Sequence, residues 1–375
     1  MNKFNCVAPC LFGLEKLVAD ELKDMGAENV LAENGRVLFS GGAEIIARAN
    51  IRSRFAERVQ ILVGSFEARS FAELFDNVKA LDWERYIGAD DAFPVKGSSI
   101  NSALYSIPDC QSIVKKAIVE RLKGKYKIDW FDELGAERKI SFFILKDKVQ
   151  LLIDTSGEGL HKRGYRADSG DAPLKETLAA AMVKLSRIYN DSTLYDPFCG
   201  SGTILIEGAL MARNVAPGMF RSFASEKFAF IPAEVWRSER AAARDMIDNT
   251  VPFKAVGSDN DPEMVKLAMS NAKKAGVSDC VNITLADVAD FSIPTDRGVT
   301  VTNPPYGERM LDIETARNLY RAMGKVFKRR HGLKYTVISP DEEFERLFGT
   351  VADKRRKLYN GSIRCQLYFY LPYLY

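Results

Sequence analysis

The sequence predicts an α/β protein whose second half forms a doubly wound, mostly parallel sheet. Three features support this fold class: a strand, glycine turn and helix between residues 193 and 213, later strands that alternate with helices, and an antiparallel hairpin after the last of them. Alternating strands and helices favour a parallel sheet, which binds its ligand beside the carboxyl ends of the strands. The hairpin predicts that the last strand runs in the opposite direction.

The first half of the chain predicts two smaller modules that mix helices and strands. The expected elements are, in order, a strand over 4–8, a helix over 14–25, strands over 30–32 and 36–39, a helix over 43–50, a strand over 59–64, a helix over 71–81, a strand over 94–99, a helix over 113–126, and strands over 140–145 and 149–154. Asn34-Gly35 suits a tight hairpin turn, and Ser70 can cap the helix that follows it. The first six elements have the order of a ferredoxin-like module.

The second half contains the larger set of elements. We expect strands over 193–195, 255–257, 281–285, 299–302 and 335–339, helices over 204–213, 262–275 and 316–329, and a hairpin that joins 354–359 to 363–371. Residues 214–253 form an insertion with a helix over 232–249, and their sequence assigns them no role. Pro173 suits the first turn of a helix. We therefore expect domains at residues 1–66, 67–165 and 166–375.

The turn after the strand at 193–195 is the main candidate site. It reads Asp196-Pro197-Phe198-Cys199-Gly200-Ser201-Gly202-Thr203. Gly200 and Gly202 permit a tight turn, and the helix that follows directs free backbone N–H groups toward it. Such a cup can bind a carboxylate, and Asp196 on its rim can bind an ammonium group. The glycines alone leave phosphate, a dinucleotide and plain helix packing as alternatives.

Two observations narrow these alternatives. No Lys-Ser or Lys-Thr pair follows the glycines, which argues against a phosphate-binding P-loop. The next acid at a strand end, Asp259, comes far later than the ~20 residues expected of a dinucleotide-binding fold. Either the insertion at 214–253 separates the two, or the ligand is not NAD.

A second motif, Asn303-Pro304-Pro305-Tyr306, follows the buried strand at 299–302. Together the two motifs resemble those of the class I S-adenosylmethionine-dependent methyltransferases that methylate amines. The basic helix and hairpin of the second module resemble a THUMP domain, the RNA-binding unit of several RNA-modifying enzymes, and residues 156–166 resemble the junction that follows it in one branch. The resemblance implies a Rossmann-like class I methyltransferase domain with a terminal antiparallel hairpin, preceded by ferredoxin-like and THUMP modules.

The resemblance also implies where the cofactor, S-adenosyl-L-methionine, binds. Its amino-acid end is expected over the glycine turn, its ribose hydroxyls at Asp259 or, with less weight, at Asn260, and its adenine amino group at Asp287. The expected cofactor-binding residues are Asp196, Phe198, Cys199, Gly200, Ser201, Gly202, Thr203, Asp259, Asn260 and Asp287.

The expected catalytic residues are Asn303, Pro304, Pro305 and Tyr306. The Asn303 side-chain oxygen and the Pro304 carbonyl can each accept one hydrogen of an exocyclic amine, which frees the nitrogen lone pair for the sulfonium methyl group. Pro305 restricts the local backbone, and Tyr306 can stack on a base. Alignment should supply most of the rate.

The resemblance implies RNA as the partner, and ribosomal RNA is the expected class. The expected RNA contacts are Lys115, Lys116, Lys162, Arg163 and Arg166, and weaker phosphate candidates are Lys325, Lys328, Arg329, Arg330 and residues 354–357. Charge alone would favour a solvated helix face, because the net charge is only +3. Two histidines and six scattered cysteines predict no metal site and reduced thiols in the cytoplasm, and no apolar run suits a membrane span.

Several functions remain open on these residues. The arrangement resembles enzymes that make N2-methylguanosine in large-subunit ribosomal RNA, whereas a related branch acts on transfer RNA with the same catalytic motif. Adenine-N6 methylation of DNA and glutamine methylation of proteins also use that motif, although neither needs a THUMP-like module. The last alternative is a non-catalytic RNA-binding protein.

Overall fold

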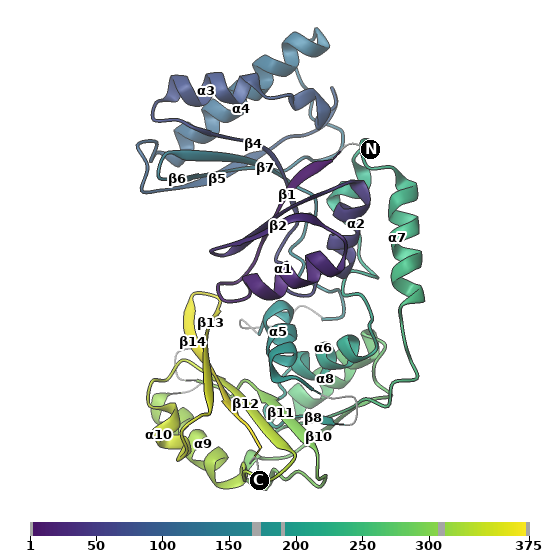
Figure 1. Cartoon of the computed structure of the whole chain (residues 1–375), viewed down its shortest axis with the longest axis vertical. Helices are drawn as coiled ribbons and strands as arrows, with labels where there is room; N and C mark the ends of the chain where they lie inside the picture. Colours follow the sequence, from purple (N-terminus) through teal and green to yellow (C-terminus); the bar gives the residue numbers. More distant parts are fainter. Residues whose placement is uncertain (1–2, 167–173, 189–191, 307–311, 373–375) are drawn as a thin grey trace.

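The computed structural model describes residues 3–166, 174–188, 192–306 and 312–372. Within these residues the chain forms two seven-stranded sheets, one in each half, which lie one above the other along the long axis of the molecule (Figure 1). This arrangement confirms the predicted α/β fold class. The expected helix start at Pro173 lies outside the described residues. No helix in the described ranges is long and apolar enough to cross a membrane.

The first half contains both small modules. Its elements are β1 (Phe4–Pro9), α1 (Glu15–Asp24), β2 (Glu28–Glu33), β3 (Arg36–Gly41), α2 (Ala43–Arg52), β4 (Gln60–Glu67), α3 (Phe71–Ala80), η1 (Trp83–Arg85), β5 (Val95–Ile100), α4 (Ile107–Tyr126), β6 (Ile140–Leu145) and β7 (Lys148–Asp154). Ser70 caps α3 in a reciprocal capping box with Glu73, as its sequence predicts. Helix α4 begins six residues earlier than expected, with Pro108 in its first turn, where the missing N–H is harmless.

The two small modules share one continuous sheet, which the sequence did not reveal. Its strand order is β2-β3-β1-β4-β7-β6-β5. Strand β4 pairs with β7 along its length, from Gln60 opposite Asp154 to Glu67 opposite Lys148. It pairs with β1 only at Cys6 and Val7 of β1. Strand β4 is therefore the seam between the modules, because it belongs to both.

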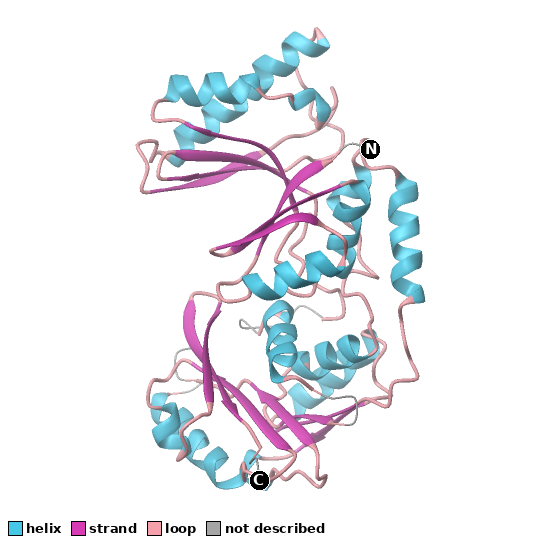
Figure 2. Ribbon diagram, in the orientation of Figure 1, coloured by secondary structure: helices cyan, strands magenta, loops and turns pink. Residues whose placement is uncertain are grey.

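The second half forms the other sheet. Its elements are α5 (Glu176–Ser186), β8 (Thr193–Asp196), α6 (Thr203–Ala212), η2 (Ala224–Lys227), α7 (Ala233–Asp245), β9 (Lys254–Asp259), α8 (Pro262–Lys274), β10 (Val281–Leu285), η3 (Val288–Asp290), β11 (Gly298–Thr302), α9 (Ile313–Val326), β12 (Leu333–Ser339), α10 (Phe344–Phe348), β13 (Lys354–Asn360) and β14 (Ile363–Tyr370). The strand order is β10-β9-β8-β11-β12-β14-β13. Strand β14 is antiparallel to both β12 and β13, which confirms the predicted reversed last strand. Helices α5, α6 and α8 lie on one side of the sheet, and α9 and α10 on the other (Figures 1 and 2).

The insertion at 214–253 returns to the first half of the chain. Its helix α7 packs along α2, at the outer edge of the molecule (Figure 1). The guanidinium of Arg48 donates to both carboxylate oxygens of Glu239, at 2.9 and 2.7 Å. The backbone N–H of Gly218 donates to the carbonyl of Ile51 at 2.8 Å. The insertion thus joins the two halves.

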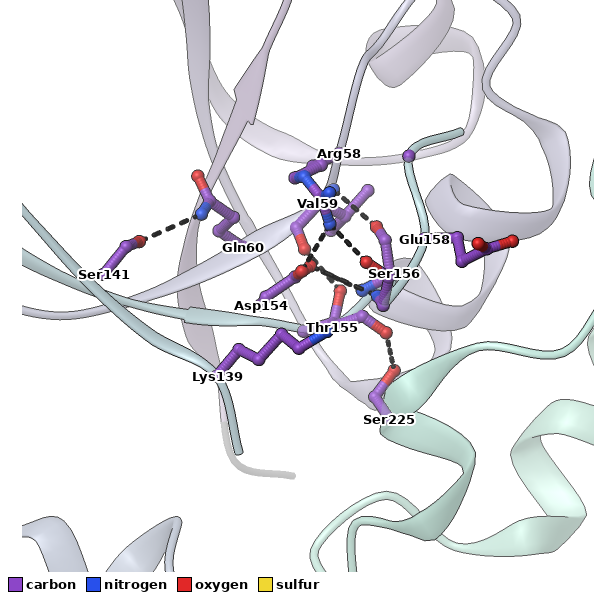
Figure 3. Close-up of polar contacts among 12 residues, drawn as sticks. Arg58, Val59, Gln60, Lys139, Ser141, Asp154, Thr155, Ser156, Glu158 and Ser225 are labelled. Carbon is purple, nitrogen blue, oxygen red and sulfur yellow. Dashed lines mark hydrogen bonds and ion pairs between the residues drawn. The ribbon is translucent and has the colours of Figure 1, made fainter. Parts of the chain in front are cut away.

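A polar network completes this connection where β7 ends (Figure 3). The Thr155 hydroxyl donates to the Val59 carbonyl at 2.6 Å, and the Val59 N–H donates to the Ser156 hydroxyl at 2.9 Å. Ser225, in the insertion, donates its hydroxyl to the Thr155 carbonyl at 2.8 Å. Arg58 forms an ion pair with Asp154 in the same network. These groups are largely buried, and the network fixes the first half relative to the second.

Candidate active site

The glycine turn has the geometry that its residues predict. The backbone of Gly200 has φ +48° and that of Gly202 has φ +81°, a region that favours glycine. A Cβ on Gly202 would lie 3.1 Å from the Cβ of Ala268, so this glycine also lets α6 approach α8. A Cβ on Gly200 would meet no described atom within 4 Å. Gly200 therefore faces open space, where a ligand could approach the backbone.

The N–H groups of the turn are less available than expected. The Phe198 N–H donates to the Asp196 carboxylate, that of Cys199 to the Ser258 carbonyl, that of Gly200 to Asp259, and that of Gly202 to the Cys199 carbonyl. Within the described ranges, only the N–H groups of Ser201 and Thr203 in this turn have no acceptor. A cofactor carboxylate could therefore use these two, together with the N-terminus of α6. Fewer N–H groups of the turn are therefore free to bind a ligand than the sequence predicts.

Asp196 is a buried carboxylate at the end of β8, only 1% exposed. Its Oδ1 accepts from the Phe198 N–H at 3.2 Å and from the Thr302 hydroxyl at 2.6 Å. Burial raises the pKa of Asp196 from 3.8 to about 7, and the neighbouring charge of Asp259 adds to this effect. No described Lys, Arg or His forms an ion pair with it. A ligand ammonium group would supply the missing positive charge.

Two further acids lie at the ends of the adjacent strands. The carboxylate of Asp259, the last residue of β9, accepts from the Gly200 N–H at 2.9 Å and from the Asp261 N–H at 3.1 Å. Each carboxylate oxygen retains acceptor capacity, so a ribose hydroxyl could still bind. Asp287, after β10, is exposed and caps η3 through the Ala289 N–H at 2.8 Å. Asn260 is exposed beside Asp259. The three acids follow neighbouring strands in the order β8, β9, β10.

Asn303 follows β11, which pairs directly with β8. The preceding residue, Thr302, donates its hydroxyl to Asp196, so the turn containing Asn303 adjoins the glycine turn. The Asn303 side-chain Oδ1 is buried and has no hydrogen-bond partner among the described residues. A buried acceptor without a donor costs about 1–3 kcal/mol, which a substrate N–H could recover. Pro304 is buried and Pro305 half-buried in the same turn.

Tyr306 is placed differently from the prediction. Its side chain is 6% exposed, and its hydroxyl accepts a hydrogen bond from the Asn360 side-chain amide at the end of β13. The ring thus offers little surface for stacking on a base, which does not agree with the predicted stacking role. Tyr306 instead ties the Asn303 turn to the β13–β14 hairpin. Asn360 was read in the sequence only as part of a turn.

The predicted RNA contacts divide into two groups. Lys115 pairs with Glu133 and lies 3.4 Å from the centroid of the Phe93 ring. Arg163 is 5% exposed and donates to the Leu160 and Arg54 carbonyls at 2.6 Å, while Arg166 donates to Glu176 at 3.2 Å. Arg163 and Arg166 are largely buried and bonded within the fold, which does not agree with their predicted RNA contact, whereas Lys115 is half-buried and stays a predicted contact.

Lys116 and Lys162 form the second group, because both are exposed. Among the described residues, the Lys162 ammonium pairs with the exposed Glu158 alone, at 3.0 Å. They remain predicted RNA contacts. Among the weaker candidates, Arg329 pairs with Asp353, and Arg330 donates to the Ile293 carbonyl at 3.0 Å.

Sequence reasoning also missed a buried cluster at the junction of the two halves. The fully buried Glu207 accepts from the Tyr165 hydroxyl at 3.0 Å and lies 3.5 Å from Arg163. An acid in the middle of the apolar helix α6 was the signal that could have indicated a buried partner.

Comparison with known proteins agrees with this geometry. Residues 163–368 match the family model described as RMKL-like, methyltransferase domain, residues 5–60 match the RlmL ferredoxin-like domain, and residues 68–154 match the THUMP domain. The "Putative RNA methyltransferase YpsC" of Bacillus subtilis is 43% identical over 99% of this chain and 96% of its own length. The crystal structure of "SMU.472, a putative methyltransferase complexed with SAH" is 40% identical, with a TM-score of 0.95 over 100% of both chains.

A further relative is longer. The "Ribosomal RNA large subunit methyltransferase K/L" of Shewanella frigidimarina is 33% identical over 98% of this chain but only 52% of its own length, so this chain spans about half of that protein. The family match covers more than half of the chain and includes the two motifs from which the site is built. The chain therefore belongs to the RMKL-like methyltransferases with ferredoxin-like and THUMP domains, enzymes that depend on S-adenosylmethionine.

Proposed function

We propose that this enzyme methylates the exocyclic amine of a base in RNA, with guanine N2 of large-subunit ribosomal RNA as the preferred target. The observation that carries the proposal is the buried, unpaired Oδ1 of Asn303, one residue from the Thr302–Asp196 hydrogen bond. An acceptor in this position suits an amine that has hydrogens to donate. A hydroxyl or thiol substrate would make less use of it.

The chain's own residues can align this amine. Its lone pair is delocalised into the base ring, which makes it a weak nucleophile. Hydrogen bonds to the Asn303 side-chain oxygen and the Pro304 carbonyl would hold both hydrogens and direct the lone pair toward the methyl group. Restricting the reactants in this way supplies most of the rate. The Tyr306–Asn360 hydrogen bond helps to keep the turn rigid.

The residues around the glycine turn fit S-adenosylmethionine, which supplies the sulfonium methyl group when bound. Asp196 would bind its ammonium group, the N–H groups of Ser201 and Thr203 its carboxylate, and Asp259 its ribose hydroxyls. Asp287 is proposed at the adenine amino group. The support for these roles is that the three acids follow adjacent strands and that Gly200 faces open space.

The domain organisation supports an RNA substrate. We propose a ferredoxin-like domain at 1–66, a THUMP domain at 67–165 and the methyltransferase domain at 166–375, with RNA bound by the THUMP domain. Ribosomal RNA is favoured because the K/L relative is named for it. A cytoplasmic location follows from that substrate. Transfer RNA and DNA adenine remain the competing substrates.

Asn303→Ala tests this assignment. We expect methyl transfer to fall by about 10²–10³-fold, the cost typical of removing one positioned catalytic hydrogen-bonding group, while calorimetry shows nearly unchanged binding of S-adenosylmethionine. The exposed Asn318→Ala, on α9, is the matched control and should keep full activity. Equal loss of binding and transfer in Asn303→Ala would contradict the catalytic role.

The substrate needs a separate measurement. Ribosomal RNA, transfer RNA and DNA from cells lacking the gene would be methylated by the purified enzyme, and the products identified by mass spectrometry of nucleosides. We expect N2-methylguanosine in large-subunit ribosomal RNA. N6-methyladenine as the product would refute the guanine assignment, and no heat of cofactor binding would favour a non-catalytic protein.

A further inference from the structure

A groove of about 800 Å³ lies where the loop after β1 meets the β13–β14 hairpin. One wall is formed by residues 10–13 with Glu15 and Asn34, and the other by Lys357, Tyr359 and residues 361–362. Figure 1 shows the hairpin reaching up to the first half beside α1. The groove is therefore built by both halves of the chain.

The two walls are fixed against each other. The guanidinium of Arg356 donates to the Gly13 carbonyl. Gly13 has φ +92°, and a Cβ there would lie 2.9 Å from the Lys357 carbonyl, so the backbones approach closely. The Glu15 carboxylate accepts from the N–H groups of Gly13 and Gly35, each at 2.9 Å. This groove is thus a preformed feature.

An exposed aromatic ring lines the groove. Phe12 is 55% exposed, although the ring centroid lies 5.9 Å from that of Tyr359 and the ring packs over Gly35. Two positive groups lie on the same face of the hairpin, because Lys357 is two residues from Tyr359 and Arg364 pairs opposite it. Neither Lys357 nor Arg364 has an ion-pair partner in the described part of the chain, and the Lys357 Nζ lies 5.3 Å from the Tyr359 ring centroid.

The groove is connected to the active-site turn through one residue. Asn360, between the lining residues Tyr359 and Gly361, donates its side-chain amide to the Tyr306 hydroxyl. Because successive side chains of a strand point to opposite faces, Asn360 meets the Asn303–Tyr306 turn on the face of β13 opposite to Lys357 and Tyr359. Aromatic rings with neighbouring cations are the combination that binds unpaired nucleic acid, because bases stack on the rings and phosphates pair with the cations.

We propose that this groove binds an unpaired segment of the substrate RNA, with a base stacked on Phe12 and phosphates at Lys357 and Arg364. The proposal rests on the proposed function and extends it, because it assigns recognition of single-stranded RNA to the junction of the two halves. The exposed Phe12 ring and the Lys357 ammonium favour RNA over an apolar protein segment, and the one carboxylate of the lining, Glu15, is already bound by two backbone N–H groups.

Binding of a fluorescent 12-nucleotide single-stranded RNA of mixed sequence tests the proposal. Phe12→Ala should raise its Kd by about 5- to 100-fold, the effect of losing one stacked base, while Phe12→Trp restores binding. Lys357→Gln should reduce the slope of log Kd against log salt concentration by about 0.7. Phe220→Ala, which removes an 82% exposed ring on the insertion, is the matched control and should leave the Kd unchanged.

The outcomes separate the two proposals. Unchanged RNA binding in Phe12→Ala, with wild-type cofactor binding and thermal stability, would overturn the groove assignment and favour a protein partner there. An equal loss in Phe220→Ala would also overturn it. If the wild-type enzyme methylates no RNA but Phe12→Ala still loses RNA binding, the methylation proposal fails and the groove proposal stands.

Discussion

Asp196→Asn should stabilise the cofactor-free enzyme while removing its affinity for cofactor. Burial raises the pKa of Asp196 from 3.8 to about 7, so the folded state prefers the protonated form. The resulting stability is fully present below pH ~4, the unfolded pKa, and is lost as the pH rises through 7. Three pKa units correspond to about 4 kcal/mol, an upper limit on the cost of ionising this group at pH 8.

Asparagine avoids that cost because it stays neutral. Its Oδ1 can still accept from the Thr302 hydroxyl and the Phe198 N–H. At pH 4 the two proteins should therefore have similar stability, whereas at pH 8 the variant should be more stable by about 1–4 kcal/mol. Chemical denaturation at both pH values measures the difference, and Asp20→Asn, on an exposed face of α1, is the control.

Cofactor affinity should depend on the same ionisation, but it should increase with pH whereas the stability decreases. Only the ionised carboxylate attracts the ammonium group, so the wild-type affinity for S-adenosylmethionine should fall about tenfold from pH 8 to pH 6. In Asp196→Asn this pH dependence should disappear together with most of the affinity. A variant that is destabilised equally at pH 4 and pH 8 would refute this reasoning.

Two further predictions concern stability. Gly202→Ala should lower the free energy of unfolding by more than Gly276→Ala does. Both glycines have positive φ, but only at Gly202 would the new Cβ meet another residue, Ala268, at 3.1 Å. Thermal denaturation should show a loss above about 1 kcal/mol for Gly202→Ala, and equal losses in the two variants would contradict the packing argument. Arg48→Ala should destabilise the packing of α7 by about 1–3 kcal/mol, because it removes the bidentate partner of Glu239, which is 6% exposed. Hydrogen exchange of the α7 amides should become faster. Unchanged protection would show that the ion pair does not hold the insertion.

The sequence by itself determined the elements that depend on local interactions. The strand, glycine turn and helix at 193–212, the hairpin at 354–370 and the Ser70 cap all follow from residues close in the chain. Glycine permits positive φ, side-chain periodicity selects strand or helix, and a cap needs only a neighbouring N–H. For the same reason, the two site motifs could be recognised before the fold was known.

The tertiary structure alone decided which partner each polar group has. The sequence predicts that Arg163 and Tyr306 contact RNA or a base. In the structure, Arg163 also donates to Arg54 and the Tyr306 hydroxyl accepts from Asn360, each more than 50 positions away, and the N–H of Gly200 donates to Asp259. The shared first sheet and the docking of α7 on α2 likewise depend on distant pairings. Charge and residue type show that a group needs a partner, but only the folded chain shows whether the protein or a ligand supplies it.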